Sequence, residues 1–218
     1  MNNKKCVIFD LDGTLLYTLE DLKNSVNHAL AACNFKERTL EEVREFVGNG
    51  IENLMRKAVP DDTDEATFQK CFEAFKSHYK VHSEDFTKEY DGVSDMLKEL
   101  KKNGFLLAVV SNKADFAVAT LCKKYFPDLL DCAFGEREGI KRKPCPDSVN
   151  EVVKLLKVSK ENCYYVGDSD VDVKTAHNAE IKCIACTWGF RSRSVLEREN
   201  PEYIIDNVNG IFEIVGVK

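Results

Sequence analysis

The sequence lacks three features that would point to particular classes of protein. It has no apolar run approaching the roughly 20 residues that a membrane-spanning helix requires. It has no excess of basic residues, since 31 lysines and arginines stand against 37 acidic residues and the net charge is −6. An acidic balance gives no support for binding to nucleic acid or to a membrane surface. We therefore expect a protein that binds neither.

A regular cysteine framework is also lacking. The nine cysteines are an odd number without the spacing of a disulfide scaffold, and several, such as Cys6, Cys132 and Cys163, stand in apolar contexts. One C-x-x-C pair, Cys183 and Cys186, falls in an expected strand, where residues three apart point to opposite faces. This pair predicts core packing rather than redox or zinc chemistry. We expect free thiols, no signal peptide and a cytoplasmic location.

The remaining composition is that of a globular protein. Hydrophobic residues make up 44% and charged residues 31% of the 218 residues, which is enough for a substantial core. Strand-like and helix-like segments alternate, which predicts an α/β fold with a Rossmann-like parallel sheet and helices on both faces. The expected strands cover residues 6–9, 105–111, 132–134, 163–167, 181–187 and 203–205. The expected helices cover residues 93–103, 115–125, 147–157, 170–178, 193–199 and 208–215.

One segment departs from this alternation. Residues 18–86 show helical periodicity and no convincing strand, and Phe68 and Phe72 begin an apolar stripe with steps of four and three residues. We predict an all-helical domain inserted into a core made of residues 1–17 and 87–218. An insertion directly after the first strand suits a lid over a site. A helical domain without that role is the alternative.

The most informative stretch lies at the end of the first strand. The apolar residues 7–9 are followed by Asp10 and Asp12, one residue apart, and by a turn at Gly13. Open α/β sheets bind ligands at the carboxyl ends of their strands, and alternate strand residues point the same way. Two carboxylates on one side need a cation, a proton or a division of roles to coexist. The pattern favours a metal-assisted nucleophile with an acid/base partner.

Three further segments end in polar residues, and parallel strands would bring all of them to the same edge of the sheet. These residues are Ser111 and Asn112 after one strand, Lys143 in a stiff turn before a proline, and Asp168 with Asp172 after another strand. A serine, a lysine and several aspartates suit phosphate chemistry with Mg²⁺. Hard oxygen ligands select that ion, and a lysine balances the charge of phosphoryl oxygens.

With these four motifs in this order, the sequence resembles the haloacid dehalogenase-like hydrolase superfamily over nearly the whole chain. The first motif, D-x-D-G-T, is matched from Asp10 to Thr14, the second at Ser111, the third at Lys143, and the fourth, G-D-x-x-x-D, from Gly167 to Asp172. The helical insertion looks like the C1 cap of that family. Within the superfamily, the chain looks most like phosphoglycolate phosphatases and the similar pyrophosphatases.

The resemblance implies catalytic roles for four residues. Asp10 would attack phosphorus and form an aspartyl-phosphate, and Asp12 would serve as the general acid and then as the general base. Ser111 would donate a hydrogen bond to a phosphoryl oxygen, and Lys143 would neutralise its charge.

The resemblance also implies the metal and substrate ligands. Mg²⁺ would be held by Asp10, by the backbone carbonyl of Asp12 and by Asp168, while Asp172 would hold a metal-bound water or orient Lys143. The other residues expected to bind the substrate are Gly13 and Asn112 through their backbone amides and Gly50 from the cap.

We therefore expect a Mg²⁺-dependent phosphatase acting on a small phosphorylated metabolite, with 2-phosphoglycolate as the leading substrate. Dehalogenases of the family lack an acid at the position of Asp12, which favours phosphoryl transfer here. A β-phosphoglucomutase-like phosphomutase, an inorganic pyrophosphatase and a non-catalytic phosphometabolite-binding regulatory module are the alternatives. Many relatives carry Asp where this chain has Tyr17, in the hinge toward the cap. Both a monomer and a homodimer are compatible with the sequence.

Overall fold

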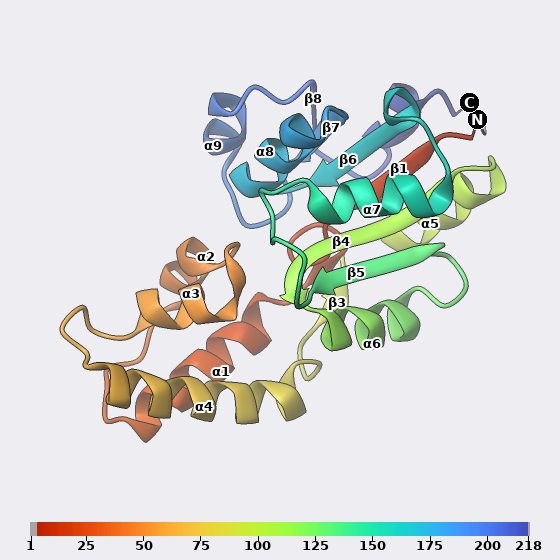
Figure 1. The fold of residues 1–218 in the computed structure, drawn as a ribbon. Coiled ribbons are helices and arrows are strands. Elements are labelled where there is room, and N and C mark those ends of the chain that lie inside the picture. The colour runs from red at the N-terminus through yellow and green to blue at the C-terminus, as the bar shows by residue number, and fades with distance from the viewer. Residues whose placement is uncertain (1–3, 218) are drawn as a thin grey trace. The chain divides into compact units, whose positions relative to one another are not determined.

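The computed structural model describes residues 4–217, and the chain divides into two compact units. One unit comprises the chain up to Leu15 and from Glu89 onward, and the other comprises Leu16–Lys88. Figure 1 shows the helices and strands of both. The second unit is thus a single insertion into the first.

Within residues 4–217, the first unit is built on a six-stranded sheet in the order β5-β4-β1-β6-β7-β8. The strands are β1 (Cys6–Phe9), β4 (Leu106–Ala114), β5 (Cys132–Glu136), β6 (Cys163–Gly167), β7 (Lys182–Cys186) and β8 (Tyr203–Ile205). All neighbouring strands are parallel. The chain passes from β1 to β4 and β5 on one side and then to β6 on the other. Ligands bind at such a reversal of strand order, beyond the carboxyl ends of the strands.

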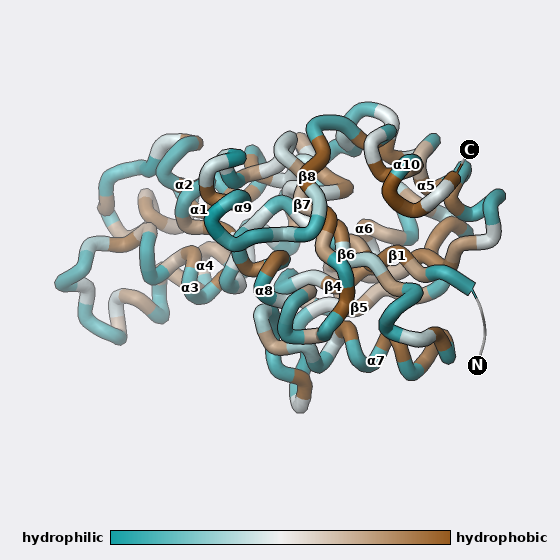
Figure 2. The backbone as a smooth tube through the Cα atoms, turned by 90° about the horizontal axis from the view of Figure 1, so that it is seen from above, coloured by the Kyte–Doolittle hydropathy of each residue, from teal (hydrophilic) through white to brown (hydrophobic). Residues whose placement is uncertain are grey.

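Helices cover both faces of this sheet, and the predicted α/β class is confirmed. They are α5 (Val93–Lys102), α6 (Asp115–Tyr125), α7 (Asp147–Leu156), α8 (Asp170–Ala179), α9 (Arg193–Arg198) and α10 (Gly210–Val215), with a 3-10 turn at Lys160–Asn162. Ile8 and Val110 of the sheet form a buried cluster with Val152 of α7 and Val173 of α8. Figure 2 shows α5 and α10 on the opposite side of the strands from α7.

The inserted unit consists of four helices and a very short strand. The helices are α1 (Leu19–Ala32), α2 (Leu40–Phe46), α3 (Gly50–Ala58) and α4 (Glu65–His82). Thr39 and Glu42 form a capping box at the start of α2, and the Asp64 carboxylate caps α4. The strands β2 (Leu16–Tyr17) and β3 (Lys88–Glu89) pair with each other. Two-residue strands have no periodicity, so the sequence pattern did not predict them.

Two observations bear on the features that the sequence lacks. No helix within residues 4–217 combines the length and the apolar composition needed to cross a bilayer. All nine cysteines are free thiols, and the C-x-x-C pair Cys183 and Cys186 is buried within β7.

Candidate active site

Three strands of the first unit deliver the candidate residues to one edge of the sheet. Phe9 at the end of β1 is level with Val109 of β4 and Val166 of β6. The Asp10 amide donates to the Val166 carbonyl at 2.9 Å, which extends the pairing by one residue. Ser111 therefore follows on one side of Asp10, and Asp168 follows on the other. This register is what brings the first, second and fourth motifs together.

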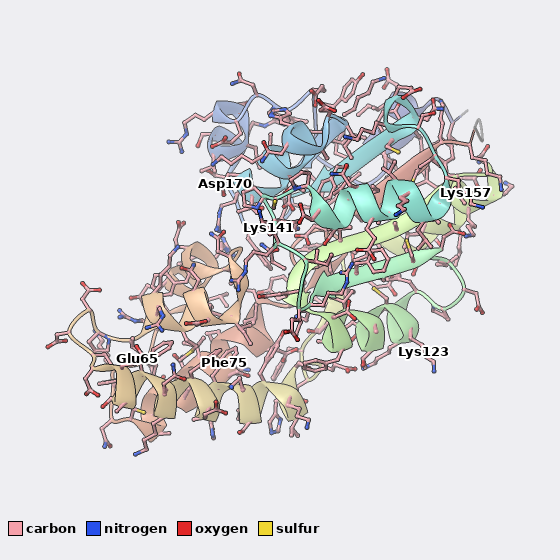
Figure 3. The ribbon with its side chains drawn as sticks, viewed as in Figure 1. Glu65, Phe75, Lys123, Lys141, Lys157 and Asp170 are labelled. Carbon is pink, nitrogen blue, oxygen red and sulfur yellow. The ribbon has the colours of Figure 1, made fainter. Side chains whose placement is uncertain are left out.

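Side chains on the neighbouring loops mark the same edge (Figure 3). Asp170 at the start of α8 and Lys141 before α7 both lie at the end of the unit where these strands terminate, whereas Lys157 lies at the opposite end of α7. Asp170 pairs with Lys174 at 3.3 Å.

Gly13 meets two requirements of the turn that follows β1. Its φ is +90°, a conformation that L side chains rarely adopt. A Cβ atom at this position would lie 2.4 Å from the Asp168 Oδ2 atom. The backbone of the first motif therefore packs directly against the carboxylate of the fourth, and only glycine allows both the turn and the contact.

Three buried carboxylates gather beside this turn. Ligand oxygens of Asp10, Asp168 and Asp172 lie within 4.8 Å of one another. The Asp168 oxygens accept hydrogen bonds from the Thr14 hydroxyl at 2.9 Å and from the Phe190 amide at 2.7 Å. These donors hold the Asp168 side chain in place.

Asp172 is fixed by the first turn of α8. Ser169 caps this helix and forms a capping box with Asp172, whose Oδ2 atom accepts from the Ser169 amide at 3.0 Å and from its hydroxyl at 2.6 Å. The other oxygen of Asp172 lies 2.7 Å from the Lys143 Nζ atom. Because both oxygens have partners, the geometry favours an orienting role toward Lys143 for Asp172.

Lys143 reaches the centre of the cluster. Its Nζ atom lies 2.8 Å from Asp10 Oδ1 and donates to the Tyr165 hydroxyl at 3.0 Å. The Asn112 side chain holds the Lys143 backbone from both sides, accepting from its amide at 2.8 Å and donating to its carbonyl at 3.0 Å. The Tyr165 hydroxyl donates to the Val110 carbonyl at 3.0 Å. The second and third motifs are thus joined by hydrogen bonds between buried groups.

Burial and mutual repulsion alter the protonation of these groups. Burial is the main cause that raises the pKa of Asp10 to about 7, with Asp172 adding to the shift and Lys143 opposing it. Burial, together with the charges of Asp172 and Asp10, raises the pKa of Asp168 to about 8. Burial alone would lower the pKa of Lys143, but the charges of Asp10 and Asp172 outweigh it and raise that pKa well above its ordinary value.

The cluster fits a hard divalent cation. Lys143 pairs with Asp10 and Asp172 of the three carboxylates, and Asp168 lies close to both of these carboxylates. The buried Asp10 Oδ1 atom is ion-paired with the Lys143 Nζ atom at 2.8 Å and is otherwise without a hydrogen-bond partner among the residues that the structure describes. A divalent ion that prefers oxygen ligands would satisfy this atom and reduce the repulsion.

Asp12 lies apart from the three carboxylates and faces a second buried lysine. The Lys113 Nζ atom lies 3.0 and 3.3 Å from the two carboxylate oxygens of Asp12. The Lys113 amide donates to the Ser111 hydroxyl at 3.3 Å. Sequence reasoning missed Lys113, although it stands only two residues after Ser111 of the second motif.

The structure brings most of the expected site residues together within the first unit. Those found at the edge of the sheet in the first unit are Asp10, Asp12, Gly13, Ser111, Asn112, Lys143, Asp168 and Asp172. Gly50 belongs to the inserted unit, where it begins α3 with a φ of +81°. Sequence reasoning also missed Tyr165, a buried hydroxyl that needs a partner in an otherwise apolar strand.

Comparison with known proteins places this geometry in a family. The model of the haloacid dehalogenase-like hydrolases matches residues 7–186. A phosphoglycolate phosphatase of Vibrio parahaemolyticus is 31% identical over 98% of this chain and 96% of its own length. Phosphoglycolate phosphatase 1 of Pseudomonas aeruginosa is 32% identical over 95% of this chain and 78% of its own length.

Solved structures give the same picture for the fold. A proposed phosphoglycolate phosphatase from Lactobacillus delbrueckii subsp. bulgaricus is 34% identical and superimposes with a TM-score of 0.92, covering 97% of this chain and 98% of that protein. A predicted phosphoglycolate phosphatase from Haemophilus somnus is 28% identical with a TM-score of 0.91, covering 98% of this chain and 99% of that protein. The likeness thus extends over both units of the chain.

Proposed function

Since the chain belongs to the haloacid dehalogenase-like hydrolase family, we propose that it hydrolyses 2-phosphoglycolate, or a closely similar small phosphorylated metabolite, with Mg²⁺ as cofactor. The resemblance inferred from the four motifs is confirmed. The expectation of a phosphoric monoester hydrolase is confirmed as well, because the full-length relatives are phosphatases. The identity of the substrate, the identity of the metal ion and the roles of individual residues are proposed.

One observation carries this proposal. Asp10 is distant in the sequence from Asp168 and Asp172, yet the buried carboxylates of all three lie together, and the ammonium group of Lys143 pairs with those of Asp10 and Asp172. Crowding of like charges in a buried place is costly for folding, and perturbed groups of this kind concentrate at functional sites. A phosphatase needs such an arrangement, because a nucleophilic carboxylate must meet an anionic phosphate beside cations.

We assign the metal ligands to two of these carboxylates. Asp10 and Asp168 would hold Mg²⁺ through side-chain oxygens, together with the backbone carbonyl of Asp12. When bound, the ion supplies positive charge that reduces the repulsion between an anionic nucleophile and an anionic phosphate. Asp172 would support the site by orienting Lys143, since both of its oxygens are engaged.

The covalent step is assigned to Asp10. One of its oxygens attacks phosphorus while the bond from phosphorus to the leaving oxygen breaks, which leaves an acyl phosphate on the side chain of Asp10. Asp12 gives a proton to the leaving oxygen. Asp12 then takes a proton from the water that hydrolyses the aspartyl-phosphate, which restores Asp10 and releases phosphate.

The phosphoryl oxygens are assigned to four groups. The Lys143 ammonium group and the Ser111 hydroxyl bind and neutralise them, and the backbone amides of Gly13 and Asn112 complete the cradle. The hydrogen bonds between the Asn112 side chain and the Lys143 backbone support this proposal. They join the two segments that carry the Lys143 ammonium group and the Asn112 amide, which suits preorganised stabilisation of charge.

For the inserted unit we propose the role of a cap. The family resemblance implies that residues 18–86 cover the substrate and that Gly50 contacts it, and four helices suit a lid that excludes bulk water. If Gly50 contacts the substrate, Gly50→Val raises KM more than it lowers kcat. An unchanged KM in a folded variant would remove Gly50 from the site.

We also propose that the protein works in a reducing compartment, the cytoplasm. Each of its nine cysteines is a free thiol, and Cys6, Cys71, Cys122 and Cys163 are among those that are buried. Thiols persist in this form where glutathione and thioredoxin keep them reduced.

The proposal is tested by measuring phosphate release from 2-phosphoglycolate, pyrophosphate and several sugar phosphates, with Mg²⁺ and with EDTA. We expect Mg²⁺-dependent release that is fastest with 2-phosphoglycolate. A coupled assay for sugar-phosphate isomerisation runs in parallel to detect a mutase. Ligand binding without release from any compound would favour the regulatory module, and isomerisation faster than release would favour the mutase.

A further inference from the structure

The second buried lysine of the site has no part in the mechanism described above. The Lys113 side chain is 3% exposed and faces the Asp12 carboxylate, which is 15% exposed. The two residues stand 101 positions apart in the sequence. Several other lysine pairs are different, because they join residues three or four positions apart on one helix, as for the exposed pair Lys98 and Asp95.

Burying an ammonium group is costly, and an ion pair such as that with Asp12 often fails to offset this cost in full. Lys113 stands on β4 two residues after Ser111, with its amide donating to the Ser111 hydroxyl, at the strand end where the phosphoryl group is expected to bind. Lys143 already provides a cation for Asp10 and for the phosphoryl oxygens. Lys113 therefore adds a second positive charge on the side of Asp12, where the leaving group departs.

We propose that Lys113 determines substrate specificity by binding a negative charge that the leaving group carries next to the scissile bond. This inference rests on the proposed phosphatase function. An oxygen that hydrogen-bonds to Asp12 lies within two hydrogen-bond lengths of the Lys113 Nζ atom, because Nζ is 3.0 Å from Asp12 Oδ1. The ammonium group carries a full positive charge, which attracts an anion at this distance while the contact with Asp12 persists.

Two kinds of substrate meet this requirement. In 2-phosphoglycolate, one methylene group separates the leaving oxygen from a carboxylate, and in pyrophosphate the leaving oxygen belongs to a second phosphate. A phosphate ester with an uncharged substituent at the same place offers nothing for Lys113 to bind. The structure thus favours compounds with an anionic leaving group over neutral-tailed esters of the same size.

The test compares 2-phosphoglycolate with 2-hydroxyethyl phosphate, which replaces the carboxylate by a hydroxymethyl group. The wild-type protein should prefer 2-phosphoglycolate in kcat/KM. In Lys113→Met, the ratio of the two kcat/KM values should fall by roughly 10- to 100-fold, the loss expected for a hydrogen bond between charged groups. Because Lys113 also contacts Asp12, both activities can decline, but an effect through Asp12 is common to both substrates and cancels in the ratio.

Two variants serve as controls. Lys113→Arg keeps the charge and should retain more of the preference than Lys113→Met. Lys98→Met removes an exposed lysine that pairs with Asp95 at 3.4 Å, and it should leave the ratio unchanged. Pyrophosphate, assayed alongside, shows which anionic leaving group Lys113 serves better.

The outcomes separate this inference from the function on which it rests. The role of Lys113 is overturned if the wild type releases phosphate from both esters without preference. It is also overturned if the ratio of the two kcat/KM values is unchanged in folded Lys113→Met. Either result leaves the proposed phosphatase function intact. Release from no phosphate ester overturns both. If Lys113→Met does not fold, the wild-type preference and competitive inhibition by glycolate, with ethylene glycol as the neutral comparison, decide the matter.

Discussion

The two units of this protein bury carboxylates in different ways. In the inserted unit, Asp21 is 1% exposed and accepts hydrogen bonds from the amides of Phe86 and Thr87 and from the Thr87 hydroxyl. In the core, Asp10 and Asp168 are buried beside another carboxylate, and their pKa values rise to about 7 and about 8. Asp21 stabilises a loop through hydrogen bonds, whereas the carboxylates of the core cluster repel one another.

This comparison shows which property of a buried charge points to function. A buried carboxylate with enough donors stabilises the fold, as at Asp21. A buried carboxylate that repels its neighbours and leaves an oxygen without a hydrogen bond, as at Asp10, is stabilised by nearby positive charge, here that of Lys143. Crowding, rather than burial, therefore distinguishes the candidate active site.

The largest effect should come from Asp10→Asn. Turnover should fall by about four orders of magnitude or more, because the variant lacks the nucleophilic carboxylate. The unfolding free energy without Mg²⁺ should stay close to that of the wild type, since a repelled charge is removed. Steady-state phosphate release and denaturant unfolding measure the two quantities. Asp95→Asn on exposed α5 is the control, and full turnover in Asp10→Asn would remove Asp10 from the mechanism.

Lys143→Met should be the most destabilising single change in the core. It leaves the carboxylates of Asp10 and Asp172 buried without their ammonium partner, which costs about 3–5 kcal/mol. Urea unfolding at neutral pH without Mg²⁺ measures this cost. Lys102→Met, which loses an exposed pair with Glu99, should change stability by less than about 1 kcal/mol. Equal effects of the two substitutions would contradict the charge balance described here.

Gly13→Ala separates backbone conformation from close packing at the site. Gly104 has a similar φ of +80°, and no atom lies within 4 Å of the place that a Cβ atom would occupy there, so Gly104→Ala should cost about 1–2 kcal/mol for conformation alone. Gly13→Ala adds the clash with Asp168 and should cost a further 1–3 kcal/mol, approximately the range for overpacking. Thermal unfolding of both variants gives the difference. Identical losses would show that the contact with Asp168 is relaxed in solution.

Asp21→Asn tests whether a buried carboxylate stabilises the inserted unit more than Asp10 stabilises the core. The substitution weakens hydrogen bonds to a charged acceptor and should lower the unfolding free energy by about 1.5–3 kcal/mol, in contrast to Asp10→Asn. Chemical denaturation of both variants, with exposed Asp85→Asn as the control, makes the comparison. A neutral Asp21→Asn together with a destabilised Asp10→Asn would reverse the distinction between the two units.

The smallest effect concerns pH. A carboxyl with a higher pKa in the folded than in the unfolded protein holds its proton where the unfolded chain has lost it. The contribution of Asp10 and Asp168 to the unfolding free energy therefore falls as pH rises from about 4 to about 8. Mg²⁺ should offset this loss and raise Tm by a few degrees more at pH 8 than at pH 5. Thermal unfolding with Mg²⁺ and with EDTA tests this, and Asp168→Ala should remove the pH-dependent difference.

Much of the fold could be predicted from local patterns. The strand at Cys6–Phe9 and the helix at Asp115–Tyr125 have the predicted bounds, because an apolar run and a helical period are properties of neighbouring residues. The strand β4 extends to Ala114, three residues beyond the expected end, because its pairing with β5 resumes at Glu136 after an irregularity. That pairing involves a partner that a single segment does not reveal.

The residues of the candidate site likewise include some that local patterns predict and some that only tertiary contacts reveal. Asp10, Ser111 and Lys143 could be proposed from motif spacing, since each follows a recognisable strand or turn. Lys113 and Tyr165 could not be proposed in this way, because the role of each depends on a contact with a residue distant in the sequence.

The sequence alone determined the order of strands and helices, the helical insertion and the four motifs, because these depend on neighbours along the chain. Only the tertiary structure decided that Lys113 faces Asp12, that Asn112 holds the backbone of Lys143, and that burial raises the pKa of Asp168. The physical reason is that strand register determines which distant residues are in contact, and exclusion of water determines how strongly their charges interact.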